Sequence, residues 1–453
     1  MEDNKALEQQ DIQKERREIR RKRRIRNQII CYGVVMALII GLGIGVVSGV
    51  KAVKTFRDQE QEIVESSQDK VEDLLASEDT LEDPEESEES SEEEEIIVEL
   101  TPEQKLDEIV NAGIGVMPLE DKVAGLFITT PEAITGVGTA VAAGNSTRDA
   151  LSKYAVGGII YSKKNIKTAA RFAEMVENTA LYAKYPLFLA VQEEGGSVSS
   201  LAAAGIADKV DGAKEIGATG DTAKAKEAGI KLAQNLQTYG LNLNLAPLAN
   251  LSNVENSVLD KRSYGSDADL AAGMITAALE GYAQTGVDTC VGFFPGAGCT
   301  TQDTNKGLAT TDRSAEDFRA NEFKVFRSAI EAGTDMIMIS HMSAPNLSGE
   351  EAPCSMSGVV VTDILRSEMG YEGIIISQAM SQKAISDYYA SDEAAIRALK
   401  AGCDMILDPE DFKLAYNGVL KAVQDGIISE ERINDSLRRI YRVKYADKIE
   451  GLQ

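Results

Sequence analysis

Pro186-Leu-Phe-Leu-Ala-Val191 is an apolar run that leads directly into Gln192-Glu-Glu-Gly-Gly196. This stretch indicates the fold of the 453-residue sequence. Such a run is too short for a helix and is bounded by turn residues, which is typical of a β-strand. Seven similar runs lie along the chain, at Ala124–Ile128, Val156–Tyr161, Leu241–Leu245, Thr289–Phe294, Met336–Ile339, Gly373–Ser377 and Cys403–Leu407. We predict a strand at each of the eight runs.

Helical patterns separate most of these runs, for example Ala169–Ala183, Ala223–Leu236, Leu270–Tyr282 and Ala315–Ile330. Upstream, Thr101-Pro-Glu-Gln104 has the features of a helix start, with Thr as the cap, Pro at the first position and Gln three residues after the cap. Strands therefore alternate with helices from residue 101 onward. Eight such units predict an α/β fold, a (β/α)₈ TIM-type barrel over residues 101–453.

Barrel proteins form their functional sites at the C-terminal ends of the strands, where the strand-to-helix loops gather. Polar residues follow four of the predicted strands there. They are Gln192, Glu193 and Glu194, the segment from Phe293 to Thr300, His341, and Gln378. We expect these positions to line one cleft.

The first fifty residues predict a membrane anchor. Nine Lys or Arg lie between Lys14 and Arg26, and the 22 residues from Ile29 to Val50 carry no charge. A helix of that length can cross a hydrocarbon core of about 30 Å. Residues 1–28 are then a basic cytoplasmic tail, 29–50 a single transmembrane helix, and the barrel domain is extracellular. A cleaved signal peptide is the alternative, but no A-x-A-like site follows Val50.

Residues 51–100 are predicted to be a stalk followed by a disordered acidic linker. Twelve of the eighteen residues from Glu78 to Glu95 are Asp or Glu. Like charges at this density repel one another and keep a chain extended and solvated. We interpret the segment as a tether, with weak divalent-ion binding or repulsion from an anionic cell wall as the alternative.

Composition excludes several classes of function. The net charge is −26, which opposes binding to nucleic acid. The cysteines at 31, 290, 299, 354 and 403 and the single histidine have no zinc-ligand spacing, and no nucleotide-binding glycine motif is present. We expect no metal and no cofactor, and we treat the cysteines as free thiols because no spacing determines a pairing. The absence of Trp argues modestly against strong carbohydrate binding.

From Met117 to Tyr445 the chain resembles glycoside hydrolase family 3, specifically its single-barrel β-N-acetylhexosaminidases that act on peptidoglycan fragments. The order and spacing of six motifs carry the resemblance: Met117-Pro-Leu-Glu-Asp-Lys-Val, Val191-Gln-Glu-Glu-Gly-Gly196, Asp260-Lys-Arg-Ser-Tyr-Gly-Ser-Asp267, Phe294-Pro-Gly-Ala-Gly298, Ile376-Ser-Gln378 and Ile428-Ser-Glu-Glu-Arg-Ile433. The resemblance implies a barrel that hydrolyses O-glycosidic bonds in carbohydrate and cell-wall metabolism.

The sequence departs from that family at both catalytic positions. The resemblance implies an aspartate nucleophile after Ile-Ser, where this chain has Gln378, and an acid/base histidine where it has Asn305. Asp303, two residues before Asn305, is retained. A neutral amide supplies neither the anionic attack of a retaining glycosidase nor a proton for the leaving oxygen.

The sugar-binding positions that the resemblance implies are altered as well. Gln192 stands in place of an aspartate, and Gly292-Phe293 in place of a Lys-His pair, while Arg262 matches the family. Glu194 and His341, which we expect to shape the strand ends, are also retained, and for Glu193 and Glu194 we favour structural roles over catalytic ones.

Two hypotheses follow. The first is a membrane-anchored pseudoenzyme that binds an N-acetylglucosamine-containing glycan fragment or a protein partner. The second is a residual β-N-acetylhexosaminidase in which the substrate's own acetamido oxygen attacks and Gln378 orients it. A purely structural role is a third possibility. Ligand, partner and oligomeric state are not determined by the sequence.

Overall fold

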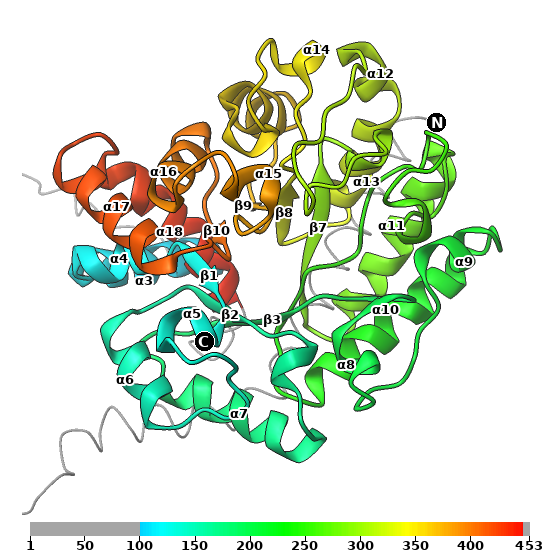
Figure 1. The fold of residues 1–453 in the computed structure, drawn as a ribbon. Helices are drawn as coiled ribbons and strands as arrows, with labels where there is room; N and C mark the ends of the chain where they lie inside the picture. Colours follow the sequence, from blue (N-terminus) through cyan, green and yellow to red (C-terminus); the bar gives the residue numbers. More distant parts are fainter. Residues whose placement is uncertain (1–99, 447–453) are drawn as a thin grey trace, which may run out of the picture. The chain divides into compact units, whose positions relative to one another are not determined.

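The computed structural model describes residues 100–446, which form an eight-stranded parallel barrel surrounded by helices (Figure 1). The barrel strands run in the order β10-β1-β2-β3-β6-β7-β8-β9. Their bounds are β1 Phe127–Thr129, β2 Gly158–Ile160, β3 Phe188–Val191, β6 Leu243–Asn244, β7 Asp288–Phe294, β8 Met336–Ile339, β9 Ile374–Ser377 and β10 Ile406–Leu407. A parallel bridge between Ile376 and Met405 joins β9 to the segment before β10 and closes the ring.

Each predicted strand overlaps one barrel strand, so the predicted α/β barrel is confirmed. Met336–Ile339 has the same bounds in sequence and structure. The other strands differ by a few residues at their ends, and β10 is only two residues long within the predicted run Cys403–Leu407. The small hairpin of β4 (Glu193–Gly195) and β5 (Val198–Ser199), which follows β3, was not predicted.

Helices cover the outside of the barrel. The longer ones are α3 Pro102–Val116, α7 Ala169–Tyr182, α10 Thr222–Gln237, α11 Ala268–Ala283, α13 Glu322–Glu331, α16 Ser391–Ala401, α17 Phe412–Gln424 and α18 Glu430–Tyr445, together with the π-helix η5 Val359–Glu368. Helices α10 and α11 approach closely because both have glycine at the contact. A Cβ on Gly229 would lie 2.3 Å from the Ala278 oxygen, and one on Gly281 would lie 2.3 Å from the Lys226 oxygen.

The single helix predicted over Ala315–Ile330 is wrong in one respect, because the structure has two helices there. Helix α12, Ala315–Ala320, ends at Asn321, whose backbone angles of φ −120° and ψ −77° are not helical. The Asn321 side chain donates to the Asp317 carbonyl at 3.0 Å and so competes with the backbone for a helical acceptor. Apolar periodicity alone does not detect such a break.

The helix start at Thr101 is confirmed as a capping box. The Gln104 backbone N–H donates to Thr101 Oγ1 at 3.2 Å, and the Thr101 N–H donates to Gln104 Oε1 at 2.8 Å. Helix α3 then lies against α18, the last described helix. Arg442 forms an ion pair of 2.9 Å with Asp107, so the two ends of the described chain are joined.

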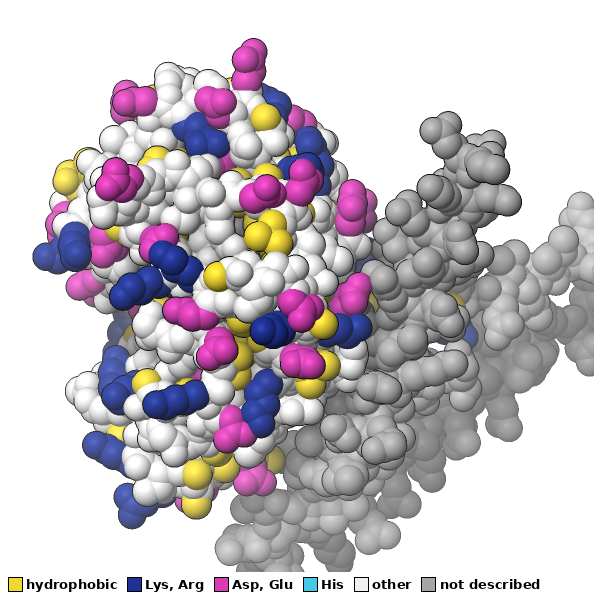
Figure 2. All heavy atoms as spheres, turned by 90° about the vertical axis from the view of Figure 1, so that its right-hand side faces the viewer, with side chains coloured by type: hydrophobic (Ala, Val, Ile, Leu, Met, Phe, Trp, Pro, Cys, Tyr) yellow, Lys and Arg dark blue, Asp and Glu magenta, His cyan; other side chains and the backbone are white. Residues whose placement is uncertain are grey.

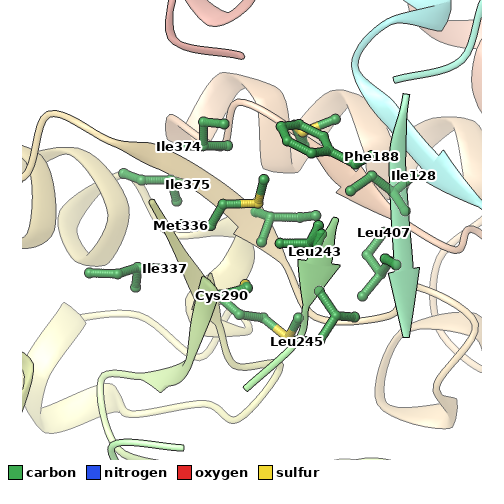
Figure 3. Packing of buried hydrophobic residues seen from close by; sticks show 14 of the residues in the cluster. Ile128, Phe188, Leu243, Leu245, Cys290, Met336, Ile337, Ile374, Ile375 and Leu407 are labelled. Atoms are coloured by element: carbon green, nitrogen blue, oxygen red, sulfur yellow. The ribbon is translucent and has the colours of Figure 1, made fainter. Parts of the chain in front are cut away.

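In the core, apolar side chains from neighbouring strands pack against one another (Figure 3), and apolar side chains from the surrounding helices also belong to it. Ile128, Leu243, Met336 and Ile374 are fully buried. On the face drawn in Figure 2, by contrast, acidic and basic side chains are interspersed.

A buried carboxylate ties the end of the barrel to its outer helices. Asp404, just before β10, is fully buried and lies 2.8 Å from Arg366 Nη2 and 3.0 Å from Arg439 Nη1. It also accepts hydrogen bonds from the Ser436 hydroxyl at 2.9 Å and the Ile375 backbone N–H at 3.0 Å. One carboxylate thus connects β9, η5 and α18.

The predicted tail (1–28), membrane span (29–50) and nearly all of the stalk and linker (51–100) lie outside the described residues. Within residues 100–446, no helix is long and apolar enough to cross a bilayer.

A cleft at the C-terminal ends of the strands

A small cleft opens among the loops that follow β6, β7, β8 and β9. Its volume is about 110 Å³. The residues that line it are Val258, Leu259, Arg262, Phe293, Ala297, Thr300, Gln302, Asp303, Thr304, Asn305, Ala309, Met342 and Gln378. Five of the nine predicted site residues are therefore together, because the C-terminal ends of neighbouring parallel strands meet at one face of a barrel.

Gln378 directly follows β9 and is only 6% exposed. Its backbone N–H donates to the Ile339 carbonyl at 2.9 Å, which continues the pairing of β9 with β8. Its side-chain Oε1 accepts the backbone N–H of His341 at 3.1 Å. The amide at the predicted nucleophile position is thus held in a fixed orientation by the neighbouring strand.

His341 does not line the cleft. Its ring is fully buried, with Nδ1 2.8 Å from the Ser355 hydroxyl and Nε2 3.0 Å from the Ala379 carbonyl. Because a carbonyl can only accept, Nε2 carries the proton and Nδ1 accepts from Ser355. Burial lowers the pKa of His341 to about 4, so the ring is neutral near neutral pH.

Asp303 and Asn305 form a closed hydrogen-bonded turn on the loop after β7. The backbone N–H and the side-chain Nδ2 of Asn305 both donate to Asp303 Oδ1 at 3.0 Å. Lys306 Nζ lies 3.6 Å from Asp303 Oδ2. Burial acts to raise the pKa of the Asp303 carboxyl, but the bonds from Asn305 and the charge of Lys306 outweigh it and lower that pKa. Asp303 is a carboxylate at neutral pH, unsuited to protonating a leaving group.

Arg262 lines the cleft and is held in place by Glu194, which lies behind it. Arg262 Nε and Nη2 donate to the two Glu194 carboxylate oxygens at 2.8 and 2.6 Å. Gln192 Nε2 also donates to Glu194, at 2.6 Å. The guanidinium lies over the Phe293 ring, 5.3 Å from its centroid. Glu194 and Gln192 therefore act on the cleft through Arg262.

Gly292 precedes Phe293 inside strand β7 and is fully enclosed. Its carbonyl accepts from the Ala249 backbone N–H at 2.7 Å and from Asn250 Nδ2 at 2.6 Å. It contributes no atoms to the cleft lining. The structure thus places Gly292, like His341, behind the site.

Glu193, next to the site, caps a helix. Its buried carboxylate accepts the backbone N–H groups of Leu201 at 2.7 Å and Ala202 at 3.3 Å. Burial raises its pKa, although these bonds act against the rise. This geometry agrees with the structural role predicted for Glu193.

The glycines after β7 are required by close contacts. Gly296 has φ +138°, and a Cβ there would lie 2.3 Å from Glu322 Cγ. A Cβ on Gly298 would lie 1.9 Å from the Leu251 carbonyl oxygen. The loop that carries Asp303 and Asn305 can therefore leave the barrel only along this glycine-containing path.

Six lining residues lie outside the positions that we expected to line the cleft, whereas Ala297 and Thr300 fall within the expected segment from Phe293 to Thr300. Val258 and Leu259 lie on the long segment between β6 and α11, and no catalytic motif marks them. Gln302 and Thr304 lie in the same loop as Asp303 and could have been found by extending the motif along that loop. Ala309 and Met342 are apolar and give no signal of function in the sequence.

Among residues 100–446, no group of three or more His, Cys, Asp or Glu side chains could hold a metal ion. The four cysteines of this region are free and buried. The described cleft thus presents amides, hydroxyls, one carboxylate and one guanidinium.

Fold and site together define a parallel α/β barrel whose polar groups gather at the C-terminal ends of its strands. Residues 118–443 match the family model described as the glycosyl hydrolase family 3 N terminal domain. The chain therefore belongs to glycoside hydrolase family 3.

Several relatives carry the name beta-hexosaminidase. The chain is 28% identical over 324 residues to beta-hexosaminidase A of Pseudoalteromonas piscicida, an alignment covering 65% of this chain and 54% of that protein. It is 28% identical over 269 residues to a beta-hexosaminidase of Nitrosomonas eutropha, covering 57% and 76%. The chain thus spans about half the length of the first relative.

A solved structure agrees with the assignment. The family 3 beta-N-acetylglucosaminidase from Paenibacillus sp. superposes with a TM-score of 0.68 at 31% identity, covering 74% of this chain and 64% of that one. A beta-N-acetylhexosaminidase from Beutenbergia cavernae gives a TM-score of 0.65 at 25% identity, covering 72% and 98%.

Proposed function

We propose that this protein is a membrane-anchored, extracytoplasmic member of glycoside hydrolase family 3 that binds a cell-wall glycan fragment or a protein partner without hydrolysing it. The observation that carries the proposal is the pair of amides, Gln378 and Asn305, at the two positions where the family resemblance implies nucleophile and acid/base. Both line the same cleft. A retaining mechanism needs a carboxylate at one of these positions and a proton donor at the other.

The size of the cleft supports the same reading. Its volume of about 110 Å³ lies well below the roughly 300–1,000 Å³ of pockets that enclose most of a small ligand. The Phe293 ring and the Arg262 guanidinium, which lies over it, occupy space along the wall of the cleft. A site of this size favours contact with part of a ligand over enclosure of a whole sugar ring.

The test is a turnover assay. The full-length chain is incubated with aryl N-acetyl-β-glucosaminides, and release of the aryl group is followed. We expect no turnover above that of a heat-denatured control. Rates in the normal range of enzymes, about 1–10³ per second, would refute the proposal.

The second candidate, a residual hydrolase, is favoured by the retention of Asp303 and Glu194 near the cleft. In that mechanism the substrate's acetamido group attacks, as in substrate-assisted glycosidases. Slow turnover that is lost in Asp303→Asn or Glu194→Gln would support it. Sugar binding with no turnover in any variant would support the pseudoenzyme.

Membrane anchoring rests on the basic segment Lys14–Arg26 and the uncharged run Ile29–Val50. Protease added to intact cells should digest the barrel domain, because the proposed topology puts residues 101–453 outside. If intact cells protect the barrel while inverted membranes expose it, the orientation is the reverse of the proposed one.

A further inference from the structure

The amide of Gln378 presents donors, not acceptors, to the cleft. Its Oε1 is engaged by the backbone N–H of His341 at 3.1 Å. That N–H can only donate, so the oxygen must face it and the orientation of the amide is fixed. Gln378 lines the cleft, and the group that it can offer to a ligand there is Nε2, with its two N–H donors.

Arg262 adds further donors on another wall of the cleft. Its Nε and one N–H of Nη2 bind Glu194. A guanidinium has five N–H donors, so both N–H groups of Nη1 and the second one of Nη2 remain. Arg262 lines the cleft and its side chain is 21% exposed, so these donors lie where a ligand can meet them.

The acceptors of the cleft are largely occupied by their own loop. Asp303 Oδ1 accepts two hydrogen bonds from Asn305, and its Oδ2 faces Lys306. Gln302 Oε1 accepts the Thr310 backbone N–H at 2.7 Å. Free donors are therefore left facing a cavity in which the acceptors of Asp303 and Gln302 are already bonded.

We propose that the cleft binds a carboxylate group of its ligand, held between the Gln378 amide and the Arg262 guanidinium. The inference rests on the proposed function, since a working retaining hydrolase needs its own carboxylate at position 378. A carboxylate only accepts hydrogen bonds and pairs well with a guanidinium. A cavity of about 110 Å³ also suits a carboxylate with a short stem better than a complete hexose.

Two pairs of small probes test the proposal by calorimetry on the full-length chain. N-acetylglutamic acid α-amide is compared with N-acetylglutamine α-amide, and N-acetylmuramic acid with N-acetylglucosamine. We expect binding of the acidic member of at least one pair, weaker at high salt, and no binding of its neutral partner. Which pair responds identifies whether the carboxylate comes from an acidic peptide or from an acidic sugar.

Charge variants of the cleft then locate the carboxylate. Gln378→Asp should weaken binding by at least about tenfold, because it opposes two like charges. Asp303→Asn should strengthen it by up to about fivefold, because it removes a negative charge from the same cavity. The control Gln284→Asp adds the same charge at the C-terminal end of α11. This position precedes the start of β7, at the end of the barrel opposite the cleft, so the change should leave the affinity for the probe unaltered.

Equal binding of acidic and neutral probes, absence of binding by all four, or unchanged affinity in Gln378→Asp would each overturn the inference. None of these results involves turnover. Sugar hydrolysis by the unmodified chain would refute the proposed function, whereas loss of carboxylate selectivity without hydrolysis refutes only this inference.

Discussion

Arg262 donates through Nε and Nη2 to both carboxylate oxygens of Glu194, at 2.8 and 2.6 Å, and so joins the loop after β6 to the loop after β3. Glu194 is only 7% exposed and also accepts from Gln192. The arginine at the position where the family resemblance implies a sugar contact is therefore already hydrogen-bonded within the protein. Its guanidinium also lies over Phe293, where the family resemblance implies a histidine.

The first prediction concerns this pair. In a double-mutant cycle with Arg262→Gln and Glu194→Gln, we expect a coupling energy of about 1–3 kcal/mol in urea unfolding, because the two groups are bidentate and largely shielded from water. The control cycle uses Arg397 and Glu393, a solvent-exposed ion pair on α16. There the coupling should not exceed about 0.5 kcal/mol. Equal couplings in the two cycles would mean that the cleft wall is not held by this interaction.

The second prediction concerns repair of the catalytic positions. Gln378→Asp combined with Asn305→His restores the residue types that the family resemblance implies for the nucleophile and the acid. We nevertheless expect turnover to stay far below about 1 per second on aryl N-acetyl-β-glucosaminides. The reason is positioning, because catalysis needs the sugar held close to its attack geometry. Gly292 and Phe293 replace two of the sugar-binding residues that the family resemblance implies. Arg262 matches that set, but its guanidinium is already bound to Glu194.

A quintuple variant provides the comparison. It adds Gln192→Asp, Gly292→Lys and Phe293→His to the double variant. A Cβ at Gly292 would make ordinary contacts, 3.4 Å from Met338 Cβ, so the change is sterically possible at its first atom. We expect detectable turnover only in the quintuple variant. Robust turnover by the double variant would instead indicate that the cleft still binds the sugar in a reactive position and that catalysis was lost recently.

The third prediction is a pH dependence carried by His341, the only histidine in the chain. Burial lowers its folded-state pKa to about 4, whereas the unfolded value is near 6.5. Between these values the unfolded chain binds more protons than the folded chain, so stability falls as the pH drops through this window. Two and a half pKa units correspond to about 3 kcal/mol.

The measurement is the free energy of unfolding in urea at pH 7 and pH 4, for the unmodified chain and for His341→Gln. Carboxylates contribute equally to both proteins, so the difference between the two pH profiles isolates the histidine. We expect the unmodified chain to lose about 3 kcal/mol more than the variant. Superimposable profiles would show that the ring is not buried in its neutral form.

The fourth prediction concerns Asp404. Asp404→Asn should lower the free energy of unfolding by about 3–5 kcal/mol, because it leaves Arg366 and Arg439 without the charge that compensates them in a buried setting. The matched control is Asp425→Asn on the exposed end of α17, which breaks an ion pair with Lys421. It should cost no more than about 1 kcal/mol. A similar cost for both changes would contradict the role assigned to Asp404.

The sequence determined the barrel and the identity of the residues at its strand ends. Eight apolar runs separated by amphipathic segments are a local signal, and each run became a strand because its side chains can be buried only in a sheet that helices cover. The sequence alone also identifies the motif Phe294-Pro-Gly-Ala-Gly298 and the two amides, Asn305 and Gln378. The break at Asn321 and the β4–β5 hairpin were missed, because they depend on side-chain bonds and turns without apolar periodicity.

Contacts between distant parts of the chain determine which predicted residues share the cleft and which groups they present to it. His341 lies just after β8 as Gln378 lies just after β9, and Gly292 is the neighbour of Phe293 within β7, yet the structure buries His341 and Gly292 behind the site. The donors that Gln378 and Arg262 offer depend on the His341 backbone and the Glu194 carboxylate, which lie 37 and 68 residues away along the chain. Sequence gives the chemical type of each side chain, but its free hydrogen-bonding groups are set by partners that only folding brings within 3 Å.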